Sequence, residues 1–116
     1  MHNYKKLEVW NESVMLVTEI YLLTDKFPDK ERFGLISQIN RSSVSVASNI
    51  AEGAGRGSKK DFSLFLGYAL ASSFDLETQL IISNNLNFIS NEQKEDVVNK
   101  LNIIQRKIYN LMKSLK

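Results

Sequence analysis

Few side chains in this sequence could perform covalent or metal chemistry. The 116-residue chain has no cysteine, and its single histidine, His2, stands outside any helical pattern. Thiol nucleophiles, disulfides and thiolate metal sites are therefore excluded. A hydrolytic triad lacks its imidazole base, and a di-metal carboxylate site lacks the Glu-x-x-His pairs that hold the ions. We predict no catalytic residue, no metal and no cofactor, and we expect a protein that is not an enzyme.

A glycine-rich turn at residues 53–57 carries the first group of basic residues. Phosphate-cradling loops are also rich in glycine, but they follow a strand and end in a Lys-Ser/Thr pair. This turn follows a helical pattern and lacks the pair, so it predicts a helix end. The cations beside it stand at the start of the next predicted helix, where unpaired amides and the helix dipole favour anions. They are Arg56, Lys59 and Lys60.

A second basic group lies in residues 97–116, which contain no acidic residue. Its members are Lys100, Arg106, Lys107, Lys113 and Lys116. Lys100 and Lys107 are seven apart, as are Arg106 and Lys113, so each pair follows one line of a helix, away from the apolar seam. The net charge of +2 is too small to name a partner. Such cations either contact nucleic acid or only favour the helix dipole and solubility.

Three breaks divide the chain into four helical patterns. Pro28, the glycine-rich turn and the asparagine-rich stretch 84–89 are the breaks. Apolar residues at three-four spacing predict helices over about residues 7–25, 28–54, 59–85 and 90–115. A glycine of the turn is expected to close the second helix in the left-handed conformation. Asn84 and Asn85, which also accept left-handed geometry, are expected to end the third helix. Ser90 with Gln93 is a capping-box pattern for the last helix.

Long helices with short connections predict an all-α fold, an antiparallel up-down-up-down four-helix bundle. The length fits a single domain covering residues 1–116. No stretch reaches the roughly 20 apolar residues of a membrane span, and the acids Glu8 and Glu12 exclude a secretory signal, so we expect a cytoplasmic protein. The predicted core is Trp10, Val14, Ile39, Val46, Ile50, Leu66, Leu76, Leu101, Ile104 and Ile108.

The second helical pattern has two stripes. Beside its apolar seam, polar residues recur at the same spacing, interleaved with serine, alanine and glycine. Either this stripe is a solvated face, or it meets another subunit, where its charged members would pair with acids such as Asp75 or Glu77. The candidate interface residues are Gln38, Arg41, Ser45, Asn49 and Glu52.

Several short motifs together resemble one protein family. They are Leu7-Glu8-Val9-Trp10, Phe27-Pro28, Phe33-Gly34-Leu35, Gln38-Ile39-Asn40-Arg41, the stretch from Ser48 to Ser58, and Leu76-Glu77-Thr78-Gln79-Leu80. The combination is similar to the four-helix-bundle family encoded in intervening sequences of bacterial 23S ribosomal RNA genes. The resemblance covers nearly the whole chain. Two positions depart from the family's frequent pattern: Asn40 replaces a basic residue, and Ala47 replaces a proline, so the second helix should be unkinked.

The resemblance implies a four-helix bundle that assembles as a homopentameric ring. It also implies a relation to the accessory protein of diversity-generating retroelements, which binds nucleic acid and a reverse transcriptase. Two functions follow as alternatives. One is a ring that binds structured RNA or DNA through Arg56, Lys59, Lys60 and the basic end of the last helix. The other is a structural ring that docks a protein partner. The sequence offers only Tyr109 as a stacking aromatic near these cations.

Overall fold

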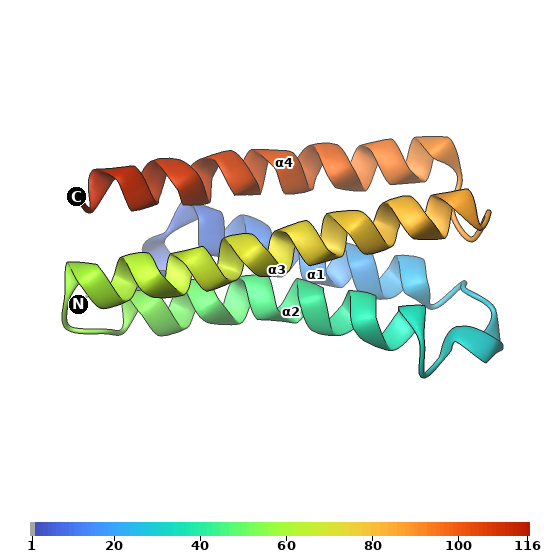
Figure 1. The fold of residues 1–116 in the computed structure, drawn as a ribbon, viewed down its shortest axis with the longest axis horizontal. Helices are drawn as coiled ribbons and strands as arrows, with labels where there is room; N and C mark the ends of the chain where they lie inside the picture. Colours follow the sequence, from blue (N-terminus) through green and yellow to red (C-terminus); the bar gives the residue numbers. More distant parts are fainter. Residues whose placement is uncertain (1) are drawn as a thin grey trace.

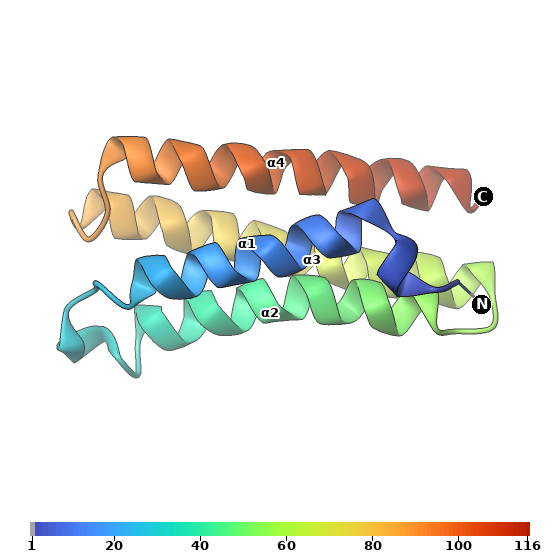
Figure 2. The same cartoon turned by 180° about the vertical axis from the view of Figure 1, so that it is seen from behind.

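Four antiparallel helices form an elongated bundle of 43 × 23 × 20 Å (Figures 1 and 2). The computed structural model describes residues 2–116. The helices are α1 (Glu8–Thr24), α2 (Leu35–Ala54), α3 (Lys59–Asn85) and α4 (Asn91–Ser114), with short 3-10 turns η1 (Tyr4–Lys6) and η2 (Asp29–Glu31). The part of the chain that the structure describes contains no strand. The predicted all-α four-helix bundle is confirmed.

The core follows the predicted seams of α2, α3 and α4. Ile39, Ile50, Leu66, Leu76, Leu101 and Ile108 are completely buried. The two core residues predicted on α1 are not buried: Val14 is 39% exposed and Trp10 only half-buried, while Val9, Ser13, Leu16, Ile20 and Thr24 face the core. Two of these are polar, and they are tolerated there because each hydroxyl donates a hydrogen bond. Ser13 donates to the Val9 carbonyl at 2.7 Å, and Thr24 to the Asn40 side chain at 2.9 Å.

The contact between α2 and α3 is the most extensive in the bundle, and the contact between α1 and α4 is the least extensive of the contacts between neighbouring helices. Small residues let α2 and α3 approach. A Cβ atom at Gly53 would lie 2.8 Å from the Phe65 Cβ atom and 3.1 Å from the backbone oxygen of Phe62. Gly53 is therefore required by close packing rather than by its backbone angles. The small-residue stripe of α2 has its close neighbour within the same chain.

One predicted helix start and one predicted cap conformation are corrected. Pro28 opens the 3-10 turn η2, and α2 begins only at Leu35, whose amide hydrogen bonds to the Glu31 carboxylate. No described glycine has a positive φ, and the residue in the left-handed region is Asn87, with φ of 63°, in the turn between α3 and α4. The glycine-rich turn instead ends α2 with Gly55 in right-handed helical geometry. The predicted capping box at Ser90 is confirmed.

Candidate nucleic-acid interface

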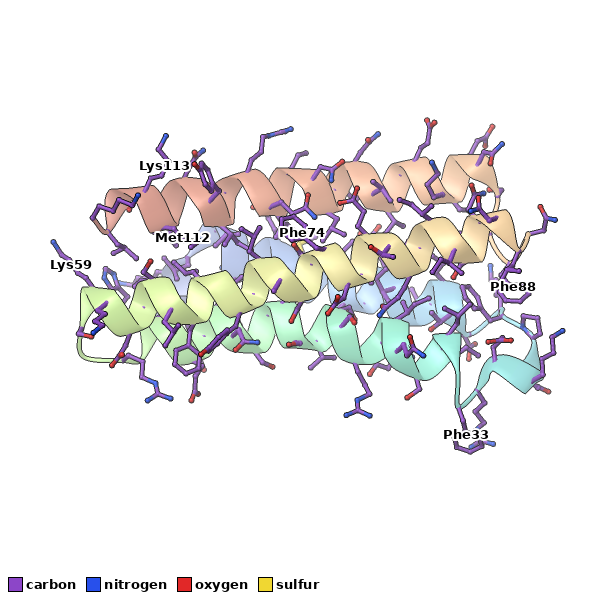
Figure 3. All side chains as sticks on the ribbon, viewed as in Figure 1. Phe33, Lys59, Phe74, Phe88, Met112 and Lys113 are labelled. Carbon is purple, nitrogen blue, oxygen red and sulfur yellow. The ribbon has the colours of Figure 1, made fainter. Side chains whose placement is uncertain are left out.

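Two basic groups that are far apart in the sequence lie at the same end of the bundle. Because α3 and α4 are antiparallel, the start of α3 and the end of α4 share this end (Figure 1), and Figure 3 shows Lys59 and Lys113 there. The N-terminal segment joins them, since the His2 amide donates to the Ala54 carbonyl at 2.8 Å. This places the exposed lysines of η1, Lys5 and Lys6, at the same end. Tertiary structure thus gathers cations that the sequence separates.

Arg56 lies on an aromatic surface. Its guanidinium carbon is 4.5 Å from the centroid of the Phe65 ring, which in turn packs edge-on against Tyr68 at 5.3 Å between centroids. The same guanidinium donates to the Glu52 carboxylate at 2.8 Å, one helical turn away. The ion pair is solvent-exposed, and such pairs contribute only about 0–1 kcal/mol to stability. Glu52 is therefore paired within the chain, by an exposed contact one helical turn away.

Lys59 and Lys60 occupy the first turn of α3. The Ser58 side chain caps this helix by accepting a hydrogen bond from the Asp61 amide at 3.1 Å. Both lysines are exposed, and neither forms an ion pair with any residue in 2–116. Their charges are available to an external anion.

Two of the predicted binding cations, Lys100 and Lys107, point toward α1 instead. Lys100 donates to Glu19 on α1 and also pairs with Asp96, and Lys107 donates to Glu12 at 2.8 Å and to Glu8. The hydrogen bonds that Lys100 donates to Glu19 and Lys107 donates to Glu12 raise the pKa of these lysines above the ordinary 10.5, and the hydrogen bond from Lys107 lowers the pKa of Glu8. Both lysines lie off the buried seam of α4, as their spacing predicts, but the register of the bundle sets α1 carboxylates opposite them.

Of the other two predicted cations of α4, Arg106 lines a groove between α3 and α4, and Lys113 lies beside the groove residue Tyr109. Arg106, Tyr109 and Asn110 of α4 face Phe74 and Leu70 of α3 across a hollow of about 520 Å³. Phe74 is 52% exposed and Tyr109 is 55% exposed. The Lys113 ammonium lies 5.6 Å from the centroid of the Tyr109 ring. Cations and accessible aromatic rings therefore occur together on this face.

Phe74 is the residue that sequence reasoning missed. It is on α3, remote in the chain from the basic residues of α4, so nothing in its immediate sequence ties it to them. One signal was present: at three-four spacing, Phe74 falls off the line of α3 residues that runs through Ser73 and Leu76. A large aromatic residue beside, rather than on, a buried seam is exposed at the surface.

A polar network fixes the groove. The Glu77 carboxylate of α3 accepts hydrogen bonds from the side-chain amides of Asn102 at 3.2 Å and Gln105 at 2.9 Å on α4. The two amide side chains also bond to each other at 2.8 Å. These half-buried bonds hold α3 and α4 in register beside Phe74 and Arg106. They also engage one oxygen of the Glu77 carboxylate.

The polar stripe of α2 is divided between the interior and the surface. The Ser45 hydroxyl hydrogen bonds to the Ser72 hydroxyl of α3 at 2.8 Å, and the Asn49 amide donates to the Ser45 carbonyl at 2.9 Å. Ser45 therefore belongs to the contact between α2 and α3, and Asn49 is bonded within α2. Gln38 and Arg41 are exposed. Arg41 and Asp75 border the same hollow, without an ion pair between them.

Comparison with known proteins places the chain in a family. Residues 5–110 match the family model of the 23S rRNA-intervening sequence protein. The chain belongs to this family. The fold agrees: the crystal structure of a protein with unknown function from the S23 ribosomal protein family of Bacteroides thetaiotaomicron VPI-5482 is similar, with a TM-score of 0.82 and 26% sequence identity. The match covers 90% of this chain and 98% of that one. No curated protein matches the chain in sequence.

Neither comparison assigns an enzymatic activity to this 23S rRNA-intervening sequence protein. Within residues 2–116, no three His, Asp or Glu side chains gather as ligands for a metal ion. None of the described helices is both long and apolar enough to cross a membrane.

Proposed function

We propose that this member of the family is a non-enzymatic, ring-forming protein that binds unpaired nucleotides of RNA or DNA along the α3–α4 face. One observation carries the proposal: the α3–α4 groove combines exposed Phe74 and Tyr109 with Arg106, and Lys113 lies beside the Tyr109 ring. Exposed aromatic rings beside cations are the combination that binds single strands, because bases stack on the rings while the cations neutralise phosphates.

The end of the bundle extends this surface. Lys59 and Lys60 have no acidic partner in the described chain, and Arg56 lies over Phe65. A strand that stacks on Tyr109 would run toward these cations, because Lys113, beside Tyr109, and Lys59 lie at the same end (Figure 3). Lys100 and Lys107 do not belong to the surface, since α1 carboxylates already neutralise them.

The salt dependence of binding tests the proposal. The probe is a fluorescein-labelled 20-nucleotide oligouridine, and the measurement is fluorescence anisotropy over a range of salt concentrations. We expect log K to fall with log salt with a slope of about −0.7 for each phosphate neutralised. Absence of binding to this probe and to a matched DNA strand at about 50 mM salt refutes the nucleic-acid function.

Two kinds of variant separate the roles of the residues. Lys113→Glu and Lys59→Glu should weaken binding and reduce the slope, because each removes a phosphate contact. Tyr109→Ala should weaken binding by roughly 1–3 kcal/mol, with the slope unchanged, because it removes stacking alone. Lys30→Glu, the same charge change in η2 at the opposite end of the bundle, is the matched control and should leave binding intact.

Self-association is the second part of the proposal. Exposed apolar side chains lie beside the exposed part of the α2 stripe: Tyr21 of α1 and Val44 of α2 border the same hollow as Arg41. A closed ring needs two different surfaces on each subunit, and α3 carries further exposed apolar residues, Leu64 and Ile82. Ring symmetry would repeat each basic end around one axis and raise the local positive charge.

Sedimentation velocity tests the assembly. The wild-type protein should sediment as an oligomer of the 13.3 kDa chain at micromolar concentration. Val44→Glu should reduce the assembly to monomers while the helical circular dichroism stays unchanged. The matched control is Leu86→Glu, an exposed apolar residue at the turn between α3 and α4. A monomeric wild-type protein contradicts the ring.

A further inference from the structure

A groove between α1 and α4 has an apolar floor. The hollow measures about 550 Å³, and Leu16 and Ile104, both buried, form its base. Met15 of α1 is 68% exposed and Ile103 of α4 is 40% exposed, and both line the groove. The two helices lie side by side in Figure 2, and their mutual contact is the least extensive between neighbouring helices of the bundle. This opening leaves apolar side chains accessible to a partner.

The rim of the groove is acidic. Each of the two lysines that bridge α1 and α4 is paired with two carboxylates, so each cluster has a net charge of −1, and the two together have −2. Since the whole chain has a charge of +2, this is an acidic face on a basic protein. The clusters consist of Lys100 with Glu19 and Asp96, and of Lys107 with Glu8 and Glu12.

The apolar surface continues along the seam for two helical turns. A second hollow, of about 250 Å³, adjoins the first at Glu19 and is lined by Leu22, which is exposed, and by Val97, with Lys26 and Asp96 as its other charged lining residues. Met15 and Leu22 are seven residues apart, which corresponds to about 10 Å along the helix axis. Two turns are the length over which a docked helix presents apolar residues at positions i, i+3 or i+4, and i+7.

We propose that the α1–α4 groove docks a basic amphipathic helix of another protein. Its apolar stripe would cover Met15, Ile103 and Leu22, and its flanking lysines or arginines would meet the acidic rim. A second copy of this chain is a poorer occupant. The acid-free basic part of the chain, residues 97–116, already packs its apolar seam into its own core, where Val97, Leu101, Ile104 and Ile108 are at most 5% exposed.

Two designed peptides test this proposal. One is a 14-residue helical peptide of leucine and lysine with leucine at helical spacing, and the other has every lysine replaced by glutamate. Fluorescence anisotropy should show binding of the lysine peptide and at least about tenfold weaker binding of the glutamate peptide. Non-specific attraction to a chain of charge +2 would instead favour the glutamate peptide. Equal binding of the two peptides, or no binding of either, overturns the proposal.

Variants locate the site. Met15→Ser combined with Ile103→Ser should weaken binding of the lysine peptide by about tenfold or more, because the apolar anchors are lost. Glu12→Gln combined with Glu19→Gln should reduce the ratio of the affinities for the lysine peptide and the glutamate peptide. The control is Phe33→Ser, which replaces an exposed aromatic residue at the η2 end of the bundle (Figure 3). It should change neither the affinity for the lysine peptide nor the preference between the two peptides.

Sedimentation of the same variants decides between occupants. The Met15→Ser, Ile103→Ser protein should keep the wild-type oligomeric state and the wild-type affinity for oligouridine. If the substitutions instead dissociate the oligomer, the groove is a contact between copies of this chain and the proposal is wrong. Because oligouridine binding is measured separately, failure here is distinguishable from failure of the nucleic-acid function.

Discussion

Two isoleucines on α4 provide a sharp test of the bundle. Ile108 is 0% exposed, whereas Ile103 is 40% exposed. Replacing each with alanine removes the same three carbon atoms, each worth about 0.8 kcal/mol when fully buried. Ile108→Ala should lose this full value and also leave a cavity, for a total of about 2–5 kcal/mol of unfolding free energy. Ile103→Ala leaves no closed cavity and should cost only about 1 kcal/mol. The higher helix propensity of alanine offsets both values equally.

Urea unfolding at one fixed protein concentration measures the difference, since self-association would otherwise shift the apparent stability. Helical circular dichroism and Trp10 fluorescence should give coincident transitions for a two-state process. Trp10 is a useful second probe because it packs edge-on against Tyr4, with ring centroids 5.0 Å apart, in the α1 region. If Ile108→Ala costs no more than Ile103→Ala, the assignment of the α4 seam to the core is refuted.

The remaining predictions concern the ion pairs, the close helix contact and the turn. Lys107→Met should lower stability relative to wild type by a constant amount between pH 4.5 and 10.5, the ordinary pKa values of glutamate and lysine. The difference should shrink below pH 4.5, as the lowered carboxylate pKa is passed, and above pH 10.5, as the raised lysine pKa is passed, which unfolding across pH can measure. Gly53→Ala should cost about 1–3 kcal/mol by overpacking against Phe65, whereas Gly57→Ala, where an added Cβ meets no atom within 4 Å, should not destabilise, as thermal unfolding can establish. Asn87→Ala should cost roughly 1–2 kcal/mol because alanine is strained at positive φ, and a Gly substitution at the same position should avoid that loss.

Local signals were enough to define most helix ends. The Ser90 cap, the Ser58 cap and the glycine-rich turn act within a few residues, so their effects can be read from neighbouring sequence. The predicted start of α2 was wrong because the local signal there was ambiguous. Pro28 fits the first turn of either an α-helix or a 3-10 turn, and the decision came from the hydrogen bond between Glu31 and Leu35.

The buried face of α1 could not be assigned from hydrophobicity alone. Val14 and Tyr21 continue an apolar pattern, yet Ser13 and Thr24 occupy the core side, because hydrogen bonds to a helix carbonyl and to Asn40 remove the cost of burying their hydroxyls. Apolar residues left outside the core remain on the surface, where the proposed assembly surfaces lie.

The sequence by itself determined the four helices, the seams of three of them, the absence of cysteine chemistry and the list of cations. Tertiary structure decided which cations are available, because ion pairs form between residues almost a full chain length apart, as between Lys107 and Glu8. It also decided that Phe74 and Tyr109 line the same groove, and that the small residues of α2 allow the close approach of α3. Spacing along one helix fixes which side chains share a face, but only the packing of helices fixes what that face meets.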